Sequence, residues 1–129
     1  MLLFDEENLE KRKAVWAALS DLFLDTDVSL NYEYIAGICA ESSFTLEELK
    51  EILENEVAPV CSKNLLSIAG EWSGFDEEWL ESNIKKGIQA RQGMFKKLLK
   101  PLKNIGFNTY IEHHWKKLES IIIEKRKAA

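Results

Sequence analysis

The sequence predicts an all-α protein: a single compact bundle of about five to seven helices with no sheet. Apolar residues recur at three- and four-residue steps along most of the chain, which is the spacing of a helix with one buried face. Several segments also carry their own start or stop signal, such as a capping residue, a glycine or a proline. No stretch shows convincing two-residue alternation, and the strand-like run Ile121–Ile123 lies within a helical pattern.

The composition is that of one ordinary globular domain. The chain has 129 residues, of which 46% are hydrophobic and 30% charged, so we expect a single domain over 1–129. No run approaches the roughly 18–20 apolar residues that span a bilayer. The acidic start Asp5–Glu7 is also unlike a signal peptide, so the expected location is the cytoplasm, away from membranes. Cys39 and Cys61 have apolar neighbours and are expected to be buried, reduced thiols rather than a disulfide or redox pair.

The first half of the chain predicts four helices. Their expected ranges are Asp5 to about Leu24, Tyr32–Glu41 after an Asn31 cap, Leu46 to Pro59, and Cys61–Ala69. The clearest start is the capping box of Thr45 and Glu48, with Phe44 and Leu49 as its hydrophobic staple. We expect Lys11, Arg12 and Lys13 to face water. Gly37 lies inside a helix, where it costs about 1 kcal/mol relative to alanine, so close packing is expected there.

The second half predicts an aromatic loop followed by helices. Glu71–Phe75 forms the loop, and Asp76 caps a helix in which Trp79, Leu80, Ile84 and Ile88 recur at helical spacing. Gln92-Gly93 weakens this helix, and Pro101 is expected to break or kink the apolar stripe that continues beyond that pair. Asn108 caps a final helix with a sustained apolar stripe, made of Ile111, Trp115, Leu118, Ile121 and Ile122.

Charge divides the chain near residue 82. Residues 1–82, the acidic body, hold 19 acidic and 5 basic side chains, and residues 83–129 hold 3 acidic and 12 basic. In one interpretation, which we favour, the basic C-terminal helices pack on the acidic body; in the other, each patch faces a partner. The sequence pI near 5.1 and the lack of a helix-turn-helix or RNA-binding signature argue against nucleic acid as that partner.

Two groups of side chains are candidate sites. Asp21, Asp25 and Asp27 cluster near a helix end, and the i, i+4 pair of Asp21 and Asp25 could bind a divalent ion, although solvated acids or caps are the simpler interpretation. In the second group, aromatic residues are surrounded by acids, a composition typical of an interface hot spot for a basic partner. The alternative is that these aromatics belong to the core. The residues expected to bind a partner are Asp21, Asp25, Asp27, Glu71, Trp72, Asp76, Glu77, Glu78 and Trp79.

Motifs for catalysis or for a cofactor are not evident. His113 and His114 are adjacent and point about 100° apart on a helix, which is poor geometry for binding one metal ion. The chain has no Gly-rich phosphate loop, nucleophile elbow or Cys-x-x-Cys pair. We therefore expect no cofactor, no metal and no enzymatic activity.

Several segments together resemble a small bacterial family known only as a domain of unknown function. They are Arg12-x-x-Val15-Trp16-x-Ala18-Leu19-Ser20-x-Leu22-Phe23-Leu24-Asp25-Thr26, Thr45–Leu49, Glu56-Val57-x-Pro59-Val60, Asn64–Leu66 and Gly70-Glu71-Trp72-x-Gly74-Phe75. The resemblance covers about residues 12–88, so we expect the last 40 residues to lie outside it. It implies no activity and assigns no catalytic residue.

The leading hypothesis is a non-enzymatic binding protein. Small, acidic, helical bacterial proteins of this type resemble immunity or antitoxin proteins, which occlude the active site of a toxin; this is an analogy of type, not of motif. One alternative is a small regulatory or adaptor domain that self-associates through its C-terminal helix, by Ile111, Trp115, Leu118 and Ile122. A second alternative is a carboxylate metal-dependent enzyme at Asp21 and Asp25.

Overall fold

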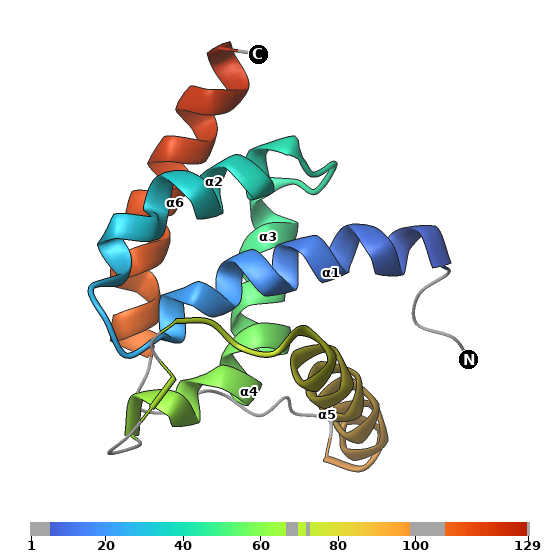
Figure 1. Ribbon diagram of the computed structural model, residues 1–129. Helices are drawn as coiled ribbons and strands as arrows, with labels where there is room; N and C mark the ends of the chain where they lie inside the picture. The colour runs from blue at the N-terminus through green and yellow to red at the C-terminus, as the bar shows by residue number, and fades with distance from the viewer. Residues whose placement is uncertain (1–5, 67–69, 72, 99–107, 129) are drawn as a thin grey trace.

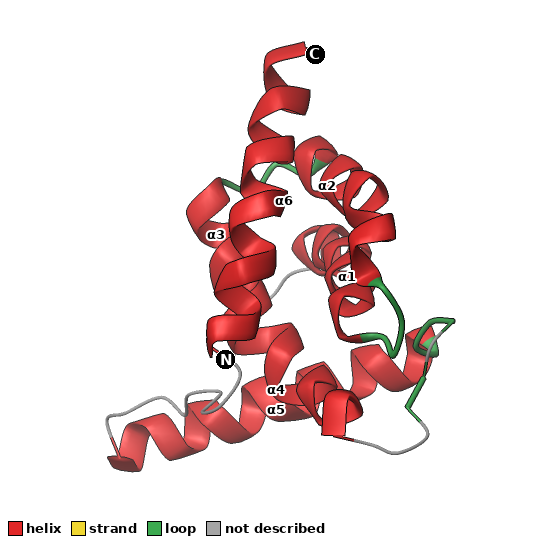
Figure 2. Cartoon of the chain, turned by 90° about the vertical axis from the view of Figure 1, so that its left-hand side faces the viewer, coloured by secondary structure: helices red, strands yellow, loops and turns green. Residues whose placement is uncertain are grey.

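The computed structural model describes residues 6–66, 70–71, 73–98 and 108–128, with side chains for these except residues 6, 66 and 91–98. In this part of the chain every regular element is helical and there is no strand, which confirms the predicted all-α class (Figure 1, Figure 2). The α-helices are α1 (Glu6–Ser20), α2 (Tyr32–Glu41), α3 (Leu46–Ile52), α4 (Ala58–Cys61), α5 (Glu77–Leu98) and α6 (Asn108–Ala128). Shorter helical segments are η1 (Asp21–Phe23), η2 (Val28–Asn31), η3 (Leu53–Val57) and η4 (Ser62–Leu66).

One hydrophobic core joins α1, η1, α2, α3, η3, α4, α5 and α6. Of the helix pairs described, α2 and α6 form the most extensive contact, and α1 also packs on α2 (Figure 1). Trp16, Leu19 and Leu49 are completely buried, and each such side chain contributes roughly 1.5–3 kcal/mol through the hydrophobic effect. Ile111, Trp115, Leu118 and Ile122 of α6 are between 0% and 3% exposed within this core. Because the chain itself buries these four side chains, they do not form the surface for a second copy that the self-association hypothesis requires.

Local signals placed several helix ends correctly. The capping box is confirmed: the Thr45 N–H donates to Glu48 Oε1 at 2.8 Å, and the Glu48 N–H donates to Thr45 Oγ1 at 3.1 Å. Phe44 and Leu49 are both buried, as a hydrophobic staple requires. The range Tyr32–Glu41 is also confirmed, but Asn31 makes no side-chain cap. The reason is that η2 runs directly into α2, so the cap stands further upstream.

That upstream cap is Asp27. Its Oδ1 accepts hydrogen bonds from the Ser29 N–H at 3.2 Å and from the Ser29 hydroxyl at 2.6 Å. The expected close packing at Gly37 is wrong, because a Cβ atom there would meet nothing within 4 Å. The helix expected to start at Asp5 continues past Ser20 as η1 and ends at Phe23, while Asp5 itself lies outside the described residues.

Pro59 does not end the third helix, contrary to the prediction. The chain passes from α3 into the π-helical turn η3 and then into α4, where Pro59 stands in the first turn. A proline is tolerated there because the first N–H groups of a helix need no intrahelical acceptor. The segment after Cys61 is the 3-10 helix η4 rather than an α-helix to Ala69, and residues 67–69 lie outside the described part. The helix that Gln92-Gly93 was expected to weaken, α5, continues through this pair to Leu98.

Arg12 does not face water, because it belongs to an ion pair between α1 and η3. Its Nε and Nη2 donate to the two carboxylate oxygens of Glu56 at 3.2 and 3.1 Å. The same carboxylate accepts the indole N–H of Trp16 at 2.7 Å, and the guanidinium lies 5.3 Å from the ring centroid of Phe44. The sequence pattern missed this pair because Arg12 and Glu56 are 44 positions apart.

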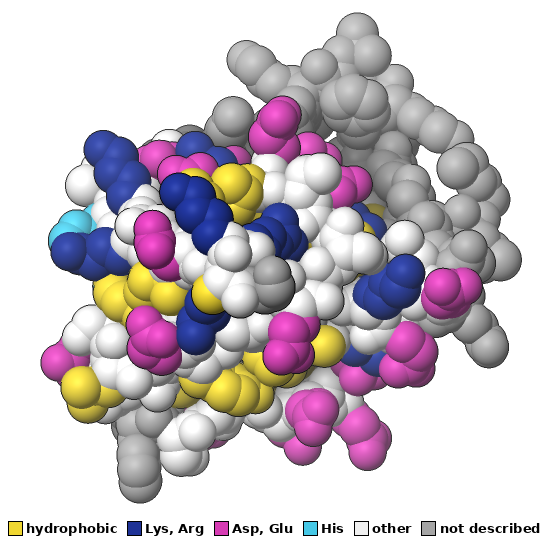
Figure 3. All heavy atoms as spheres, turned by 90° about the horizontal axis from the view of Figure 1, so that it is seen from above, with side chains coloured by type: hydrophobic (Ala, Val, Ile, Leu, Met, Phe, Trp, Pro, Cys, Tyr) yellow, Lys and Arg dark blue, Asp and Glu magenta, His cyan; other side chains and the backbone are white. Residues whose placement is uncertain are grey.

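The basic helix α6 makes direct contacts with the acidic body. Lys125 pairs with Glu33 of α2 at 3.1 Å, which is the sense that the charge division predicts. A second pair has the opposite sense, because Lys50 of α3 pairs with Glu112 of α6 at 2.8 Å. Arg126 donates to the carbonyl oxygens at the end of α2 and just beyond it, those of Cys39, Ala40, Ser42 and Phe44. Acidic and basic side chains are interspersed on the face in Figure 3. For α6, the Lys125 and Arg126 contacts support the interpretation that the basic C-terminal helices pack on the acidic body. Pro101 and the rest of residues 99–107 lie outside the described part.

Candidate functional site

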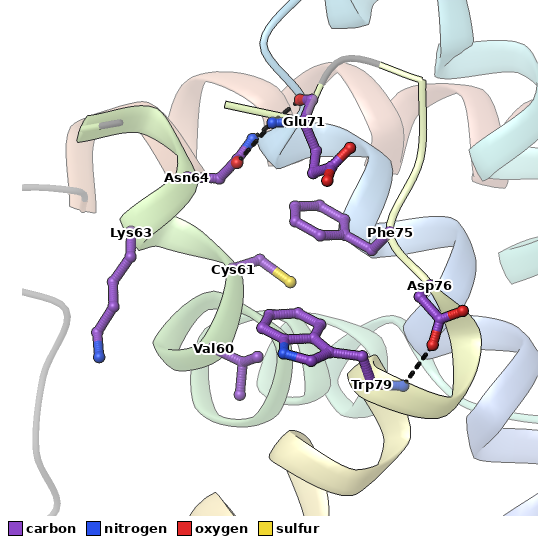
Figure 4. A pocket seen from close by; sticks show the side chains of 8 residues that line it. All are labelled: Val60, Cys61, Lys63, Asn64, Glu71, Phe75, Asp76 and Trp79. Atoms are coloured by element: carbon purple, nitrogen blue, oxygen red, sulfur yellow. Dashed lines mark hydrogen bonds between the residues drawn. The ribbon is translucent and has the colours of Figure 1, made fainter. Parts of the chain in front are cut away.

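A hollow of about 470 Å³ lies between α4, η4 and the first turn of α5 (Figure 4). Its lining residues come from before and after the connection between η4 and α5. The shape of the hollow therefore depends on how the chain folds back after η4. Its lining combines apolar and aromatic side chains with two carboxylates, an amide and an amine. We call this hollow the aromatic groove, and it is lined by Val60, Cys61, Lys63, Asn64, Glu71, Phe75, Asp76 and Trp79.

Two stacked rings form one wall of the aromatic groove. The centroids of Phe75 and Trp79 are 5.9 Å apart, and their planes differ by 12°. Asp76 holds the start of α5, because its Oδ2 accepts the Trp79 N–H at 2.9 Å, as predicted for a cap. Trp79 remains 46% exposed while Phe75 is partly buried. Trp79 is therefore not a core residue, which decides against the core interpretation for this ring.

Asn64 fixes the opposite wall. Its Oδ1 accepts the Glu71 N–H at 2.8 Å, and its Nδ2 donates to the carbonyl oxygens of Glu71 and Phe23 at 3.0 and 2.9 Å. The chain approaches Asn64 so closely that a Cβ on Gly70 would lie 2.8 Å from the Asn64 carbonyl oxygen. A glycine is therefore required at this position. The sequence pattern did not single out Asn64 as a site residue, since its partners lie elsewhere in the chain.

The two predicted acidic groups meet at one backbone hydrogen bond. The Asp25 N–H donates to the Glu71 carbonyl oxygen at 2.7 Å, which brings the segment after η1 beside the loop before α5. Asp25 and Asp27 are exposed, whereas Asp21 is partly buried, and this burial raises the pKa of the Asp21 carboxyl. Leu24 between them is extended, so Asp21 and Asp25 do not share a helix face as the metal hypothesis assumed.

The remaining predicted residues fall on or near the same surface. Glu71, Asp76 and Trp79 line the aromatic groove. Glu77 and Glu78 are exposed on the adjoining first turn of α5, and Trp72 lies outside the described residues. Of the second predicted group, the structure thus brings Glu71, Asp76 and Trp79 together at one hollow.

The two cysteines are buried and free, as expected. Burial raises the pKa of both the Cys39 and the Cys61 thiol to about 12, so neither is a thiolate near neutral pH. Cys61 lines the aromatic groove, but a protonated, buried thiol is a poor nucleophile and serves there as an apolar surface.

A second, broader hollow of about 850 Å³ lies between η2 and α6. It is lined in part by Asp27, Lys116 and Lys117, and by Tyr32 and His114, whose hydroxyl and Nδ1 form a hydrogen bond. Burial, and then the nearby His113 and Lys117, lower the pKa of His114. Within the described residues, no three His, Cys, Asp or Glu side chains are grouped so that they could hold a metal ion. None of the described helices has the length and apolar character needed to cross a membrane.

The fold and the groove define a small all-α protein with an exposed aromatic surface. The chain belongs to a family described as a domain of unknown function (DUF7079), whose model matches residues 10–121. The match includes most of α6, so the expectation that the last 40 residues lie outside the family is wrong. The charge boundary near residue 82 is therefore internal to the family domain. Neither a curated protein nor a solved structure matches the chain significantly.

Proposed function

We propose that this chain is a non-enzymatic binding protein that recognises a partner protein at the aromatic groove. The observation that carries this proposal is Trp79, a large aromatic ring that stays 46% exposed beside a hollow of about 470 Å³ and is held flat against Phe75. Tryptophan is enriched among the few interface residues that supply most of the binding energy. A pre-ordered ring also loses little conformational freedom when a partner covers it.

The charge around the groove suggests a basic partner. Glu71 and Asp76 line the hollow, and Glu77 and Glu78 are exposed on the next residues of α5. A local excess of negative charge accelerates association with a positively charged protein and disfavours acidic partners. We propose that the partner is a bacterial toxin with a basic active site, and that this chain acts as its immunity or antitoxin-like protein in the cytoplasm.

The first test is capture of the partner from the native host, with variants of the full chain. Trp79→Ala should reduce the captured partner at least about tenfold, the usual effect of removing a hot-spot side chain. Tyr34→Ala is the matched control, because Tyr34 is also an exposed aromatic, at 60%, but lies on α2 away from the groove. Equal capture by both variants and the unmodified chain would contradict the proposal.

The second test is kinetic. Replacing Glu77 and Glu78 by lysine should slow association with the captured partner at low salt and have little effect at high salt, because salt screens exposed charges. The control for net charge is the double replacement of Glu47 and Glu51 by lysine, at two exposed positions of α3. Inhibition of the partner's toxic activity by the unmodified chain would support the immunity function. A captured partner that binds but has no toxic activity would be compatible with the binding function and would overturn the immunity function.

A further inference from the structure

The aromatic groove has one flat apolar wall and one acidic edge. Phe75 and Trp79 form the wall, with nearly parallel ring planes, and Trp79 is the more exposed of the two. In Figure 4 the carboxylate of Glu71 hangs beside the Phe75 ring, on the groove side of its backbone. A flat aromatic face next to a carboxylate matches a planar cation, which stacks on the ring and forms a charged hydrogen bond at its edge.

The backbone of Glu71 is held in place before any ligand arrives. Its N–H and carbonyl oxygen are both bound to Asn64, and the carbonyl also accepts the Asp25 N–H at 2.7 Å. No ion pair with a described side chain occupies its carboxylate. Because the backbone is already ordered, binding at this carboxylate loses less conformational entropy than binding at a mobile loop.

The amine in the lining does not fill the groove. The Lys63 side chain extends away from the two rings in Figure 4 and is exposed. Asp76 adds a second negative charge, and one of its oxygens already accepts the Trp79 N–H. The local balance therefore favours a cationic guest over an anionic one.

We infer that the aromatic groove binds an arginine side chain of the partner, with the guanidinium packed against the wall of Phe75 and Trp79 and hydrogen-bonded to Glu71 beside Phe75. This inference rests on the proposed function and names the chemistry of the group that enters the groove. Arginine suits the geometry better than lysine, because its planar fork can stack and form two parallel hydrogen bonds at the same time. A lysine ammonium would gain the charge interaction without the flat stacking contact.

The test is a titration of the full chain with Nα-acetyl-L-arginine methylamide, followed by NMR of the tryptophan indole N–H groups. Trp79→Phe identifies the Trp79 resonance among the four tryptophans. The Trp79 signal should shift saturably. The citrulline analogue has nearly the same shape without the charge, and we expect it to bind at least about tenfold more weakly, while the lysine analogue falls between the two.

Two matched variants separate a defined site from general attraction. Glu71→Gln should weaken binding of the arginine probe about five- to tenfold, whereas Glu77→Gln, which removes the same charge outside the lining, should change it less than about twofold. Equal losses in the two variants would overturn the inference, since they would indicate diffuse attraction. Equal binding of arginine and citrulline probes, or no shift of Trp79, would also overturn it. If the arginine inference fails but capture of a partner protein still depends on Trp79, the proposed function stands. If the arginine probe binds but no partner is captured through Trp79, the proposed function alone is overturned.

Discussion

Asn64 binds both backbone polar groups of Glu71, accepting its N–H at 2.8 Å and donating to its carbonyl oxygen at 3.0 Å. The same amide also donates to the Phe23 carbonyl oxygen at 2.9 Å. One side chain on η4 therefore connects the end of η1 to the loop before α5. Because Asn64 and Glu71 both line the aromatic groove, its shape depends on a residue that carries no charge and no aromatic ring.

Replacing Asn64 should destabilise the chain and loosen the groove. Asn64→Ala removes three hydrogen bonds and is expected to lower the free energy of unfolding by about 2–3 kcal/mol, measured by urea denaturation. Asn83→Ala is the control, because Asn83 makes one exposed hydrogen bond, to the Trp79 carbonyl oxygen at 2.8 Å. Asn83→Ala should lower the free energy of unfolding by less than about 1 kcal/mol. Similar midpoints for the two variants would show that the Asn64 bonds contribute no special stability.

Breaking the ion pair between α1 and η3 should have a large effect. The side chains of Arg12 and Glu56 are only 20% and 12% exposed, so Glu56→Ala leaves a partly buried guanidinium without this partner and removes an acceptor from Trp16. We expect a loss of about 2–4 kcal/mol in unfolding free energy.

The control for that measurement is Glu7→Ala, which breaks the exposed pair with Lys11. Exposed pairs contribute roughly 0–1 kcal/mol, so this variant should denature close to the unmodified chain. A Glu56→Ala variant as stable as Glu7→Ala would contradict the structural role assigned to the inner pair.

Arg126 is expected to be the main polar anchor of α6 on α2. Its guanidinium donates to four carbonyl oxygens, the shortest at 2.7 Å to Phe44, near the negative end of the α2 dipole. Arg126→Ala should lower the unfolding free energy by about 2 kcal/mol, and Arg126→Lys should recover less than about half of the loss, because an ammonium cannot reproduce the planar fork. Lys127→Ala, on an exposed neighbour, should stay within about 0.5 kcal/mol. Full recovery with lysine would mean that charge alone matters there.

Protonation of His114 should reduce stability below neutral pH. Its pKa in the folded chain is lowered from the ordinary 6.5 by burial and by His113 and Lys117, so the unfolded chain binds this proton more readily. The stability contributed by neutral His114 is therefore present above about pH 6.5 and is lost as the pH falls through the folded-state pKa.

The measurement is the unfolding free energy at about pH 7.5 and about pH 5.5. His114→Gln should flatten the decrease between the two values, even if its absolute stability is lower. His113→Gln removes an exposed imidazole and should retain most of the decrease. If the decrease is unaffected by His114→Gln, another group is responsible for it.

Much of the helical framework was predictable because its signals are local. The Thr45 capping box, the range Tyr32–Glu41 and the Asp76 cap each depend on residues within a few positions of one another. The gathering of aromatic and acidic residues between 71 and 79 was also visible, because these residues are close in sequence. The position of Pro59 within the helices was not predictable, since a proline fits both the end of one helix and the first turn of the next.

Other features depended on partners that are distant in the sequence. Arg12 looked like one of three exposed cations, until the fold brought Glu56 to it from 44 positions away. The C-terminal apolar stripe of Trp115 and Leu118 fitted either a core or a dimer surface, and only the packing of α6 on α2 decides between them. Whether Trp79 is buried was likewise open, because helical spacing does not say which face meets the core.

The sequence by itself determined the all-α class, most helix starts and the chemical character of the loop before α5. These follow from periodicity and capping, which act within one or two helical turns. The tertiary structure alone decided that Asn64, Glu71 and Asp25 are hydrogen-bonded to one another through Glu71, and that Phe75 and Trp79 line the aromatic groove beside them. Such contacts form between segments far apart in the chain, where no local pattern encodes the distance or the direction in which they approach.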